Sequence, residues 1–303
     1  MWQAESRLAR EPLVVLGAFA AATNRIKLGM GAVNIWGHNP AILAASLLTL
    51  DDLAPDRIQC GLSLWWEPLA SQVGIERHRP LLAMREVTYA LRELLAMHQV
   101  TMQGDYVRLS KIGLDVIHGR RIPRQVPIYM AVSGPRLAAL AGEIADGVLL
   151  NYLVSPGYTT GAVEQIAVGV RQSGRTIDDV ERAQLIVCSV DRDRQQAMTV
   201  ARRFVTLYIR QQPQIMRTNG VPQELIDEIS RILPPDPSDD QLSTAMQHVP
   251  DSIVQLVTAS GTAEECRLRV NDYIRAGATY PVLYPLGNDV RYMIDVFAHG
   301  YRT

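Results

Sequence analysis

One stretch of the chain, residues 126–152, contains the pattern of a complete strand–helix–strand unit. Residues 126–132 form a short and almost wholly apolar run, which is typical of a parallel strand buried on both faces. A helical pattern follows at 136–145, and a second apolar run occupies 148–151. Because parallel strands need such a crossover between them, the stretch predicts a β–α–β unit and favours an α/β fold.

The break between this strand and its helix consists of Ser133, Gly134 and Pro135. Serine can cap a helix, glycine lets a ligand approach the backbone closely, and proline suits the first helical position. Together they predict a helix start whose free N–H groups face outward, where they would bind an anion such as a phosphate. An ordinary helix cap has the same composition, so this feature alone leaves both interpretations open.

The same alternation of apolar runs and helical patterns extends along most of the chain. The predicted strands lie near residues 1–5, 26–34, 57–64, 126–132, 147–151, 183–190 and 280–284. Two excursions, near 98–125 and 211–250, interrupt the alternation, and the first has the pattern of a hairpin. Repeated β/α units predict a TIM (β/α)8-type barrel with these insertions, as a single domain over residues 1–303. A doubly wound sheet is the alternative fold.

Composition and charge argue against several classes of protein. The 30 basic and 31 acidic residues give a net charge of −1, so no global field would recruit nucleic acid or an anionic membrane. The apolar stretch from Pro12 to Thr23 is too short to span a bilayer, and no secretory signal is visible. We therefore expect a cytoplasmic protein that acts on a small-molecule substrate, without nucleic acid or membrane partners.

The three cysteines, Cys60, Cys188 and Cys266, lie far apart in the sequence and form no CxxC pair. This spacing fits buried thiols in a reducing compartment better than a disulfide or a metal site. We therefore expect no bound metal.

Two glycines, Gly29 and Gly31, stand inside the predicted strand at 26–34. Glycine is unusual within a strand because it gives up packing and β-propensity, so the pair indicates a bulge or a closely approaching ligand; a simple twist of the strand is the alternative. A dinucleotide-binding motif is rejected, because the third glycine is missing and no helix follows immediately.

Trp65 and Trp66 stand at the C-terminal end of the predicted strand at 57–64. Parallel barrels place their substrate loops at these strand ends. The two rings could line a substrate pocket that holds a ring compound, or they could cap a hydrophobic core.

Eight short motifs follow one another along essentially the whole chain, and their order and spacing are more specific than any one of them. They are Trp2-x-x-Glu5-Ser6, Thr23–Gly29, Asn39–Ala44, Thr49–Arg57, Ser133–Pro135, Leu140–Gly147, Gly261–Cys266 and Ala276–Thr279. Together they resemble the bacterial-luciferase-like family of flavin and deazaflavin oxidoreductases. The most similar branch is the coenzyme F420-dependent methylenetetrahydromethanopterin reductase-like one.

This resemblance implies a TIM barrel, usually dimeric, that binds F420 or, alternatively, FMN at the C-terminal ends of its strands. Gly31-Ala32 matches a bulge where the family often has a non-prolyl cis peptide behind the cofactor ring, and Ser133–Pro135 matches its phosphate loop. Glu5 matches an acidic, catalytic position near the reactive carbon of the deazaflavin, where it would be either a proton donor or an orienting carboxylate. Asn34 would bind the cofactor.

Two departures from the family pattern are visible at the start of the chain. Ser6 falls in the substrate pocket where some relatives that oxidise sugar phosphates carry a histidine, which argues against a sugar phosphate as the substrate. Family members also usually have about one further β/α unit before the position of Met1, so the barrel is expected to lack its first unit. A late start of the sequence, a segment that fills the gap and an open barrel all remain possible explanations.

Three hypotheses of function follow. The first is an F420-dependent oxidoreductase that transfers a hydride between the deazaflavin and an organic substrate, as a homodimer. The second is an FMN-dependent luciferase-like monooxygenase, which would also consume dioxygen. The third, a non-catalytic barrel subunit, would bind neither cofactor.

Overall fold

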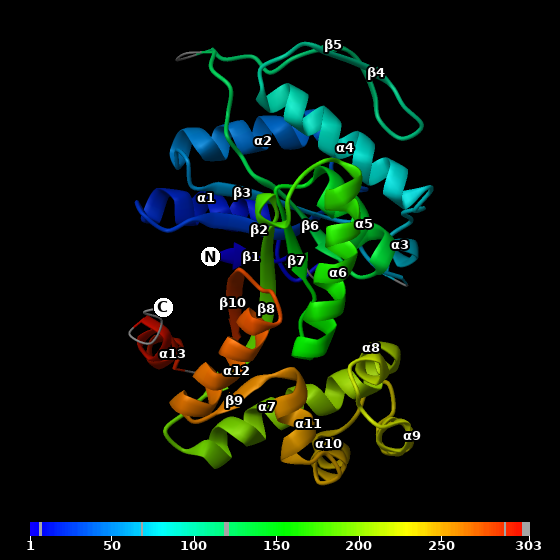
Figure 1. Cartoon of the computed structure of the whole chain (residues 1–303), viewed down its shortest axis with the longest axis vertical. Coiled ribbons are helices and arrows are strands. Elements are labelled where there is room, and N and C mark those ends of the chain that lie inside the picture. The colour runs from blue at the N-terminus through cyan, green and yellow to red at the C-terminus, as the bar shows by residue number, and fades with distance from the viewer. Residues whose placement is uncertain (6–7, 68, 118–120, 288, 299–303) are drawn as a thin grey trace. The chain divides into compact units, whose positions relative to one another are not determined.

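The computed structural model describes residues 1–5, 8–67, 69–117, 121–287 and 289–298 (Figure 1). The chain forms two compact units. Unit 1 contains residues 1–149 and 164–181, and unit 2 contains residues 150–163 and 182–303. The expectation of a single domain over residues 1–303 stays a prediction.

Unit 1 is built on a parallel sheet. In spatial order its strands are β1 (Trp2–Gln3), β2 (Leu28–Asn34), β3 (Ile58–Ser63), β6 (Ile128–Val132) and β7 (Gly147–Leu150). The pairings of β1 with β2, β2 with β3 and β3 with β6 are all parallel. Parallel strands joined through helices confirm the β/α alternation that the sequence predicts.

Helices connect and cover these strands. They are α1 (Pro12–Ala22), α2 (Pro40–Leu53), α3 (Leu69–Gln72), α4 (Pro80–Leu95), α5 (Pro135–Ile144), α6 (Pro156–Gln172) and the 3-10 turn η1 (Ile177–Asp179). Residues 156–163 of α6 belong to unit 2, and residues 164–172 belong to unit 1. Figure 1 shows α1, α2 and α4 side by side along one side of the sheet. Proline occupies the start of α1, α2, α4 and α5, where its missing N–H costs nothing.

The excursion near 98–125 contains a hairpin, as predicted. Strands β4 (Val100–Gln103) and β5 (Arg108–Ile112) form a separate antiparallel sheet. Residues 118–120 of the excursion lie outside the described part of the chain.

An ion pair joins α4 to α5 in unit 1. Arg85 donates two hydrogen bonds of 2.6 Å to the two oxygens of Glu143. These bonds hold the pKa of the Glu143 carboxyl below its ordinary value.

Replacing Glu143 by glutamine should therefore lower the free energy of unfolding by about 0.5 kcal/mol at neutral pH, since the pair is partly exposed. A carboxyl with a depressed folded-state pKa stabilises the fold above its unfolded pKa and loses that contribution as the pH falls through the folded value. Urea unfolding of both proteins should show the difference at pH 7 and its loss at acidic pH, below the lowered pKa of Glu143. A difference that persists at low pH would contradict the assignment.

Unit 2 contains a shorter parallel sheet and a group of helices. Its strands are β8 (Glu181–Val190), β9 (Ala259–Gly261) and β10 (Tyr280–Pro285). Strand β8 pairs with both of the others. Its helices are α7 (Arg194–Gln211), α8 (Pro213–Thr218), α9 (Gln223–Ile232), α10 (Asp239–Met246), α11 (Asp251–Val257), α12 (Ala263–Arg275) and α13 (Val290–Ala298).

The excursion near 211–250 forms α8, α9 and α10, which share a hydrophobic core with α7 and α11. Met216, Ile229 and Val254 are fully buried there, together with Val205 on α7. The excursion is therefore packed into unit 2 through an apolar core that it shares with α7 and α11.

Cys60, Cys188 and Cys266 are buried and free. Burial raises the pKa of the Cys60 thiol to about 12, which keeps it unreactive. Among the described residues, no group of three or more histidines, cysteines or carboxylates has a geometry suited to a metal ion. None of the helices in the described ranges combines the length and apolar character needed to cross a bilayer.

Candidate active site

The C-terminal ends of four neighbouring strands of unit 1 place the predicted site residues at one edge of the sheet. Glu5 follows β1, Asn34 ends β2, Trp65 follows β3 and Ser133 follows β6. Because these strands are parallel and adjacent in the order β1, β2, β3 and β6, their ends lie together. Ser6 lies outside the described residues, so its predicted place in the pocket stays a prediction.

The predicted bulge is present in β2. The peptide bond between Gly31 and Ala32 is cis, as expected from the family resemblance, and the register between β2 and β3 shifts between Met30 and Val33. The bulge turns the carbonyl of Met30 toward β3. A Cβ atom at Gly61 would overlap this carbonyl oxygen, so glycine is required there.

Packing against Trp2 gives the two strand glycines a further explanation, beside the bulge. The indole ring of Trp2, on β1, occupies the space beside Gly29, where a Cβ would overlap it. A Cβ at Gly31 would lie 3.3 Å from the Cβ of Trp2. The Trp2 ring in turn meets Tyr129 edge to face, with centroids 5.0 Å apart. A closely approaching ligand is therefore the wrong interpretation of Gly29, because a tryptophan fills that space.

Glu5 and Asn34 form a fixed pair. The backbone N–H of Asn34 donates to one carboxylate oxygen of Glu5 at 2.7 Å, and its side-chain Nδ2 donates to the other at 2.8 Å. Asn34 is 3 % exposed, and its Oδ1 accepts a bond of 2.6 Å from the N–H of Gly37. Both oxygens of Glu5 act as acceptors in this arrangement. The geometry therefore favours an orienting carboxylate over a proton donor.

The start of α5 is open. Its cap is Gly134, not the predicted Ser133, and no side chain caps the helix. The helix has its first hydrogen bond from the N–H of Ala138 to the carbonyl of Gly134, at 3.0 Å, so the N–H groups of Arg136 and Leu137 have no acceptor within the helix. A Cβ added at Gly134 would meet no atom within 4 Å. This opening suits an anion bound by backbone amides.

The two tryptophans after β3 lie at the predicted strand end. Trp65 is partly buried, and its Nε1 is enclosed without a hydrogen-bond partner among the described residues. Trp66 is 38 % exposed. Since enclosed polar groups in native proteins are normally bonded, the Trp65 N–H marks a place for a ligand atom or a water.

Sequence reasoning missed two aromatic residues that surround this edge. Trp36 follows β2, and its Nε1 donates to the carbonyl of Leu64 at 2.9 Å, which ties the loop after β2 to the loop after β3. Tyr106, in the hairpin turn, donates its hydroxyl to the carbonyl of Ile35 at 2.7 Å. The hairpin pattern was visible in the sequence, but its contact with the site was not.

Comparison with known proteins identifies the family. The family model described as luciferase-like monooxygenase matches residues 1–280. The chain is 29 % identical over 280 residues to the 5,10-methylenetetrahydromethanopterin reductase of Methanolobus tindarius. The matched region covers 92 % of this chain and 83 % of that protein. It is 29 % identical over 214 residues to the F420-dependent glucose-6-phosphate dehydrogenase of Nakamurella multipartita, covering 69 % of this chain and 62 % of that one.

A solved structure gives the same result for the fold. The coenzyme F420 dependent tetrahydromethanopterin reductase from Methanopyrus kandleri superposes with a TM-score of 0.86 at 24 % identity, over 98 % of this chain and 88 % of that one. The likeness confirms the α/β TIM-barrel fold and rules out the doubly wound alternative. With the family model matched over residues 1–280, the chain belongs to the luciferase-like monooxygenase family.

Proposed function

We propose that this protein is an F420-dependent oxidoreductase that transfers a hydride between the deazaflavin and a small organic substrate. The observation that carries the proposal is the open start of α5, where no side chain caps the helix, the amides of Arg136 and Leu137 have no acceptor within the helix, and a Cβ at Gly134 would meet no atom within 4 Å. The relatives named as F420-dependent enzymes support the choice of cofactor.

The residues at the strand ends fit such a cofactor. The amides of Arg136 and Leu137 would hold its phosphate, in the manner of helix starts that bind anions. The enclosed N–H of Trp65 would gain the partner that it lacks within the described residues. The bulge in β2, between Met30 and Val33, would support the ring system.

The protein's own contribution is orientation and the exclusion of water. F420, when bound, supplies the ring carbon that accepts or releases the hydride. Asn34 holds Glu5 through two hydrogen bonds, so that this carboxylate orients the groups above the sheet edge. Trp65 and Trp66 line the substrate pocket and shield it from water.

The alternative is an FMN-dependent monooxygenase, which the description of the matching family favours. A fluorescence titration of the purified protein with F420 and with FMN separates the two. We expect F420 to bind at least tenfold more tightly. Tighter binding of FMN, with uptake of dioxygen by the reduced flavin, would reverse the assignment, and binding of neither would favour a non-catalytic barrel subunit.

We further propose a cytoplasmic homodimer. Large apolar side chains stand exposed on two neighbouring helices of unit 1, with Val14 on α1 at 74 % and Ile42 on α2 at 69 %. Such side chains support association with a second copy. Light scattering of the purified protein would give the mass of the assembly.

A further inference from the structure

We propose that Tyr106, in the turn of the β4–β5 hairpin, is a positioning residue that holds the cofactor-site loop in place, and that Glu86 on α4 holds Tyr106. The inference rests on the proposed function for its effect on F420. Its structural part, the link between the hairpin and the loop at residues 34–37, can be tested without any cofactor.

Glu86 fixes the hairpin turn. Its side chain is buried, and its carboxylate accepts hydrogen bonds from the backbone N–H groups of Asp105, Tyr106 and Val107, at 3.0, 2.9 and 2.8 Å. A Cβ at Gly104 would overlap the Glu86 carboxylate, so the turn closes around the acid. A buried carboxylate that satisfies three consecutive amides sets the conformation of that turn.

Tyr106 transmits this position to the loop after β2. Its hydroxyl donates to the carbonyl of Ile35 at 2.7 Å, and its ring meets the ring of Trp36 edge to face, with centroids 5.1 Å apart. Ile35 and Trp36 directly follow Asn34, the residue that binds the Glu5 carboxylate. A shift of the loop would therefore move Asn34 relative to Glu5 and disturb the pair that they form.

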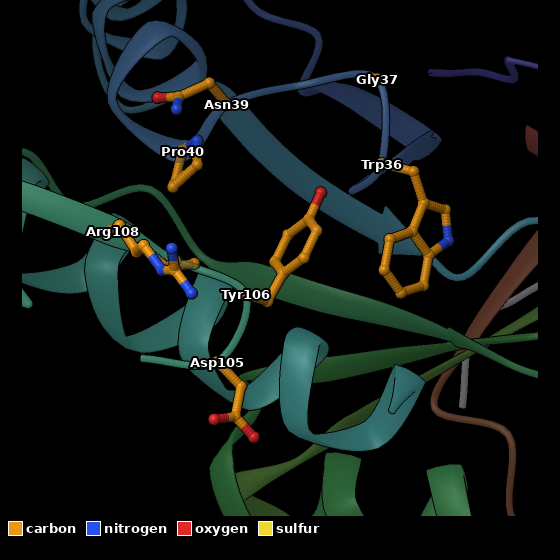
Figure 2. Close-up of a pocket in the computed structure, with 8 residues that line it drawn as sticks. Trp36, Gly37, Asn39, Pro40, Asp105, Tyr106 and Arg108 are labelled. Atoms are coloured by element: carbon orange, nitrogen blue, oxygen red, sulfur yellow. The ribbon is translucent and has the colours of Figure 1, made fainter. Parts of the chain in front are cut away.

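Two cavities lie beside the Tyr106 contact. A cavity of about 440 Å³ separates the loop from the hairpin. Figure 2 shows the Tyr106 side chain standing in it, between Trp36 on one side and Pro40 on the other. A second cavity, of about 290 Å³, lies on the α4 side of the same tyrosine. The hydroxyl bond and the ring contact of Tyr106 connect the hairpin to the loop beside these cavities.

The test compares wild type with Tyr106→Phe, which removes the hydroxyl and keeps the ring. Tyr89→Phe is the matched control, because Tyr89 lies on α4 and is 56 % exposed. Hydrogen exchange of the apo proteins follows the amides of Asn34, Ile35 and Gly37. Loss of one hydrogen bond should speed this exchange by about five- to tenfold in Tyr106→Phe and leave it unchanged in Tyr89→Phe.

F420 titration of the same proteins supplies the second measurement. We expect Tyr106→Phe to bind F420 about five- to tenfold more weakly and to change the fluorescence of the bound cofactor, while the melting temperature falls by only about 2–4 °C. Glu86→Gln should give the same local change in exchange, and the double variant should not exceed the larger single effect. A general loss of stability would instead lower the melting temperature without altering the bound spectrum.

The outcomes separate the two proposals. Unchanged exchange at residues 34–37 in Tyr106→Phe overturns the inference, whatever the protein binds. Faster exchange with unaltered F420 affinity also overturns it, because the loop would then not set the cofactor site. Faster exchange in a protein whose wild type binds no F420 supports the hairpin link and overturns the proposed function instead.

Discussion

Replacement of Gly61 by alanine is expected to lower the free energy of unfolding by about 3 kcal/mol. The new Cβ would overlap the carbonyl oxygen of Met30, which the bulge in β2 turns toward β3. A backbone atom cannot rotate away as a flexible side chain can. The alanine therefore has to displace either the bulge or the strand.

The same displacement should weaken F420 binding by at least tenfold, because β2 ends at Asn34, which binds the Glu5 carboxylate. Urea unfolding measures the first effect, and a fluorescence titration under folding conditions measures the second. An unfolding midpoint equal to that of wild type would contradict the prediction.

Gly17→Ala is the control for this substitution. Gly17 lies inside α1, and a Cβ there would meet no atom within 4 Å. Alanine has the higher helix propensity, so this variant should gain about 0.5–1 kcal/mol of stability. The two glycine-to-alanine changes should therefore act in opposite directions, and the difference isolates the effect of the close approach to Met30.

The sequence predicts local structure well where a pattern is local. The unit predicted at 126–132, 136–145 and 148–151 corresponds to β6, α5 and β7 within about two residues at each boundary. Apolar runs and a proline at the helix start are sufficient for this. By contrast, β9 has only the three residues Ala259–Gly261, with little β-propensity, and its strand character comes from pairing with β8.

Less of the candidate site can be predicted from the sequence, because its contacts join residues that lie far apart along the chain. The Glu5–Asn34 pair depends on the register of β1 against β2, in which Trp2 stands opposite Gly29. No pattern along the chain contains that register. The space taken by the Trp2 ring is likewise a fact of packing, so a glycine that makes room for a side chain looks in the sequence like one that makes room for a ligand. Gly61 stands inside a predicted strand, and a glycine there is a local signal of the close approach between β3 and the carbonyl of Met30.

Replacement of Gly134 by valine is expected to weaken F420 binding by about a hundredfold or more while leaving the apo protein as stable as wild type. A side chain at this position would stand at the open start of α5, beside the phosphate site proposed at the amides of Arg136 and Leu137, and should cost the protein two charge-assisted hydrogen bonds to the phosphate.

The apo protein should tolerate the change, because nothing lies within 4 Å of the added Cβ and the backbone at Gly134 is extended, with φ −161° and ψ 165°. Valine adopts this conformation readily, and the loss of freedom in the unfolded chain should offset any small cost. Gly134→Ala should fall between wild type and valine in affinity, since its side chain reaches less far into the space.

Fluorescence titration gives the three affinities, and thermal unfolding without cofactor gives the three stabilities. Equal F420 affinity across the series would show that this helix start does not bind the cofactor. A fall in apo stability that parallels the fall in affinity would show that the glycine serves packing. A ligand site instead predicts that the affinity falls while the apo stability stays constant.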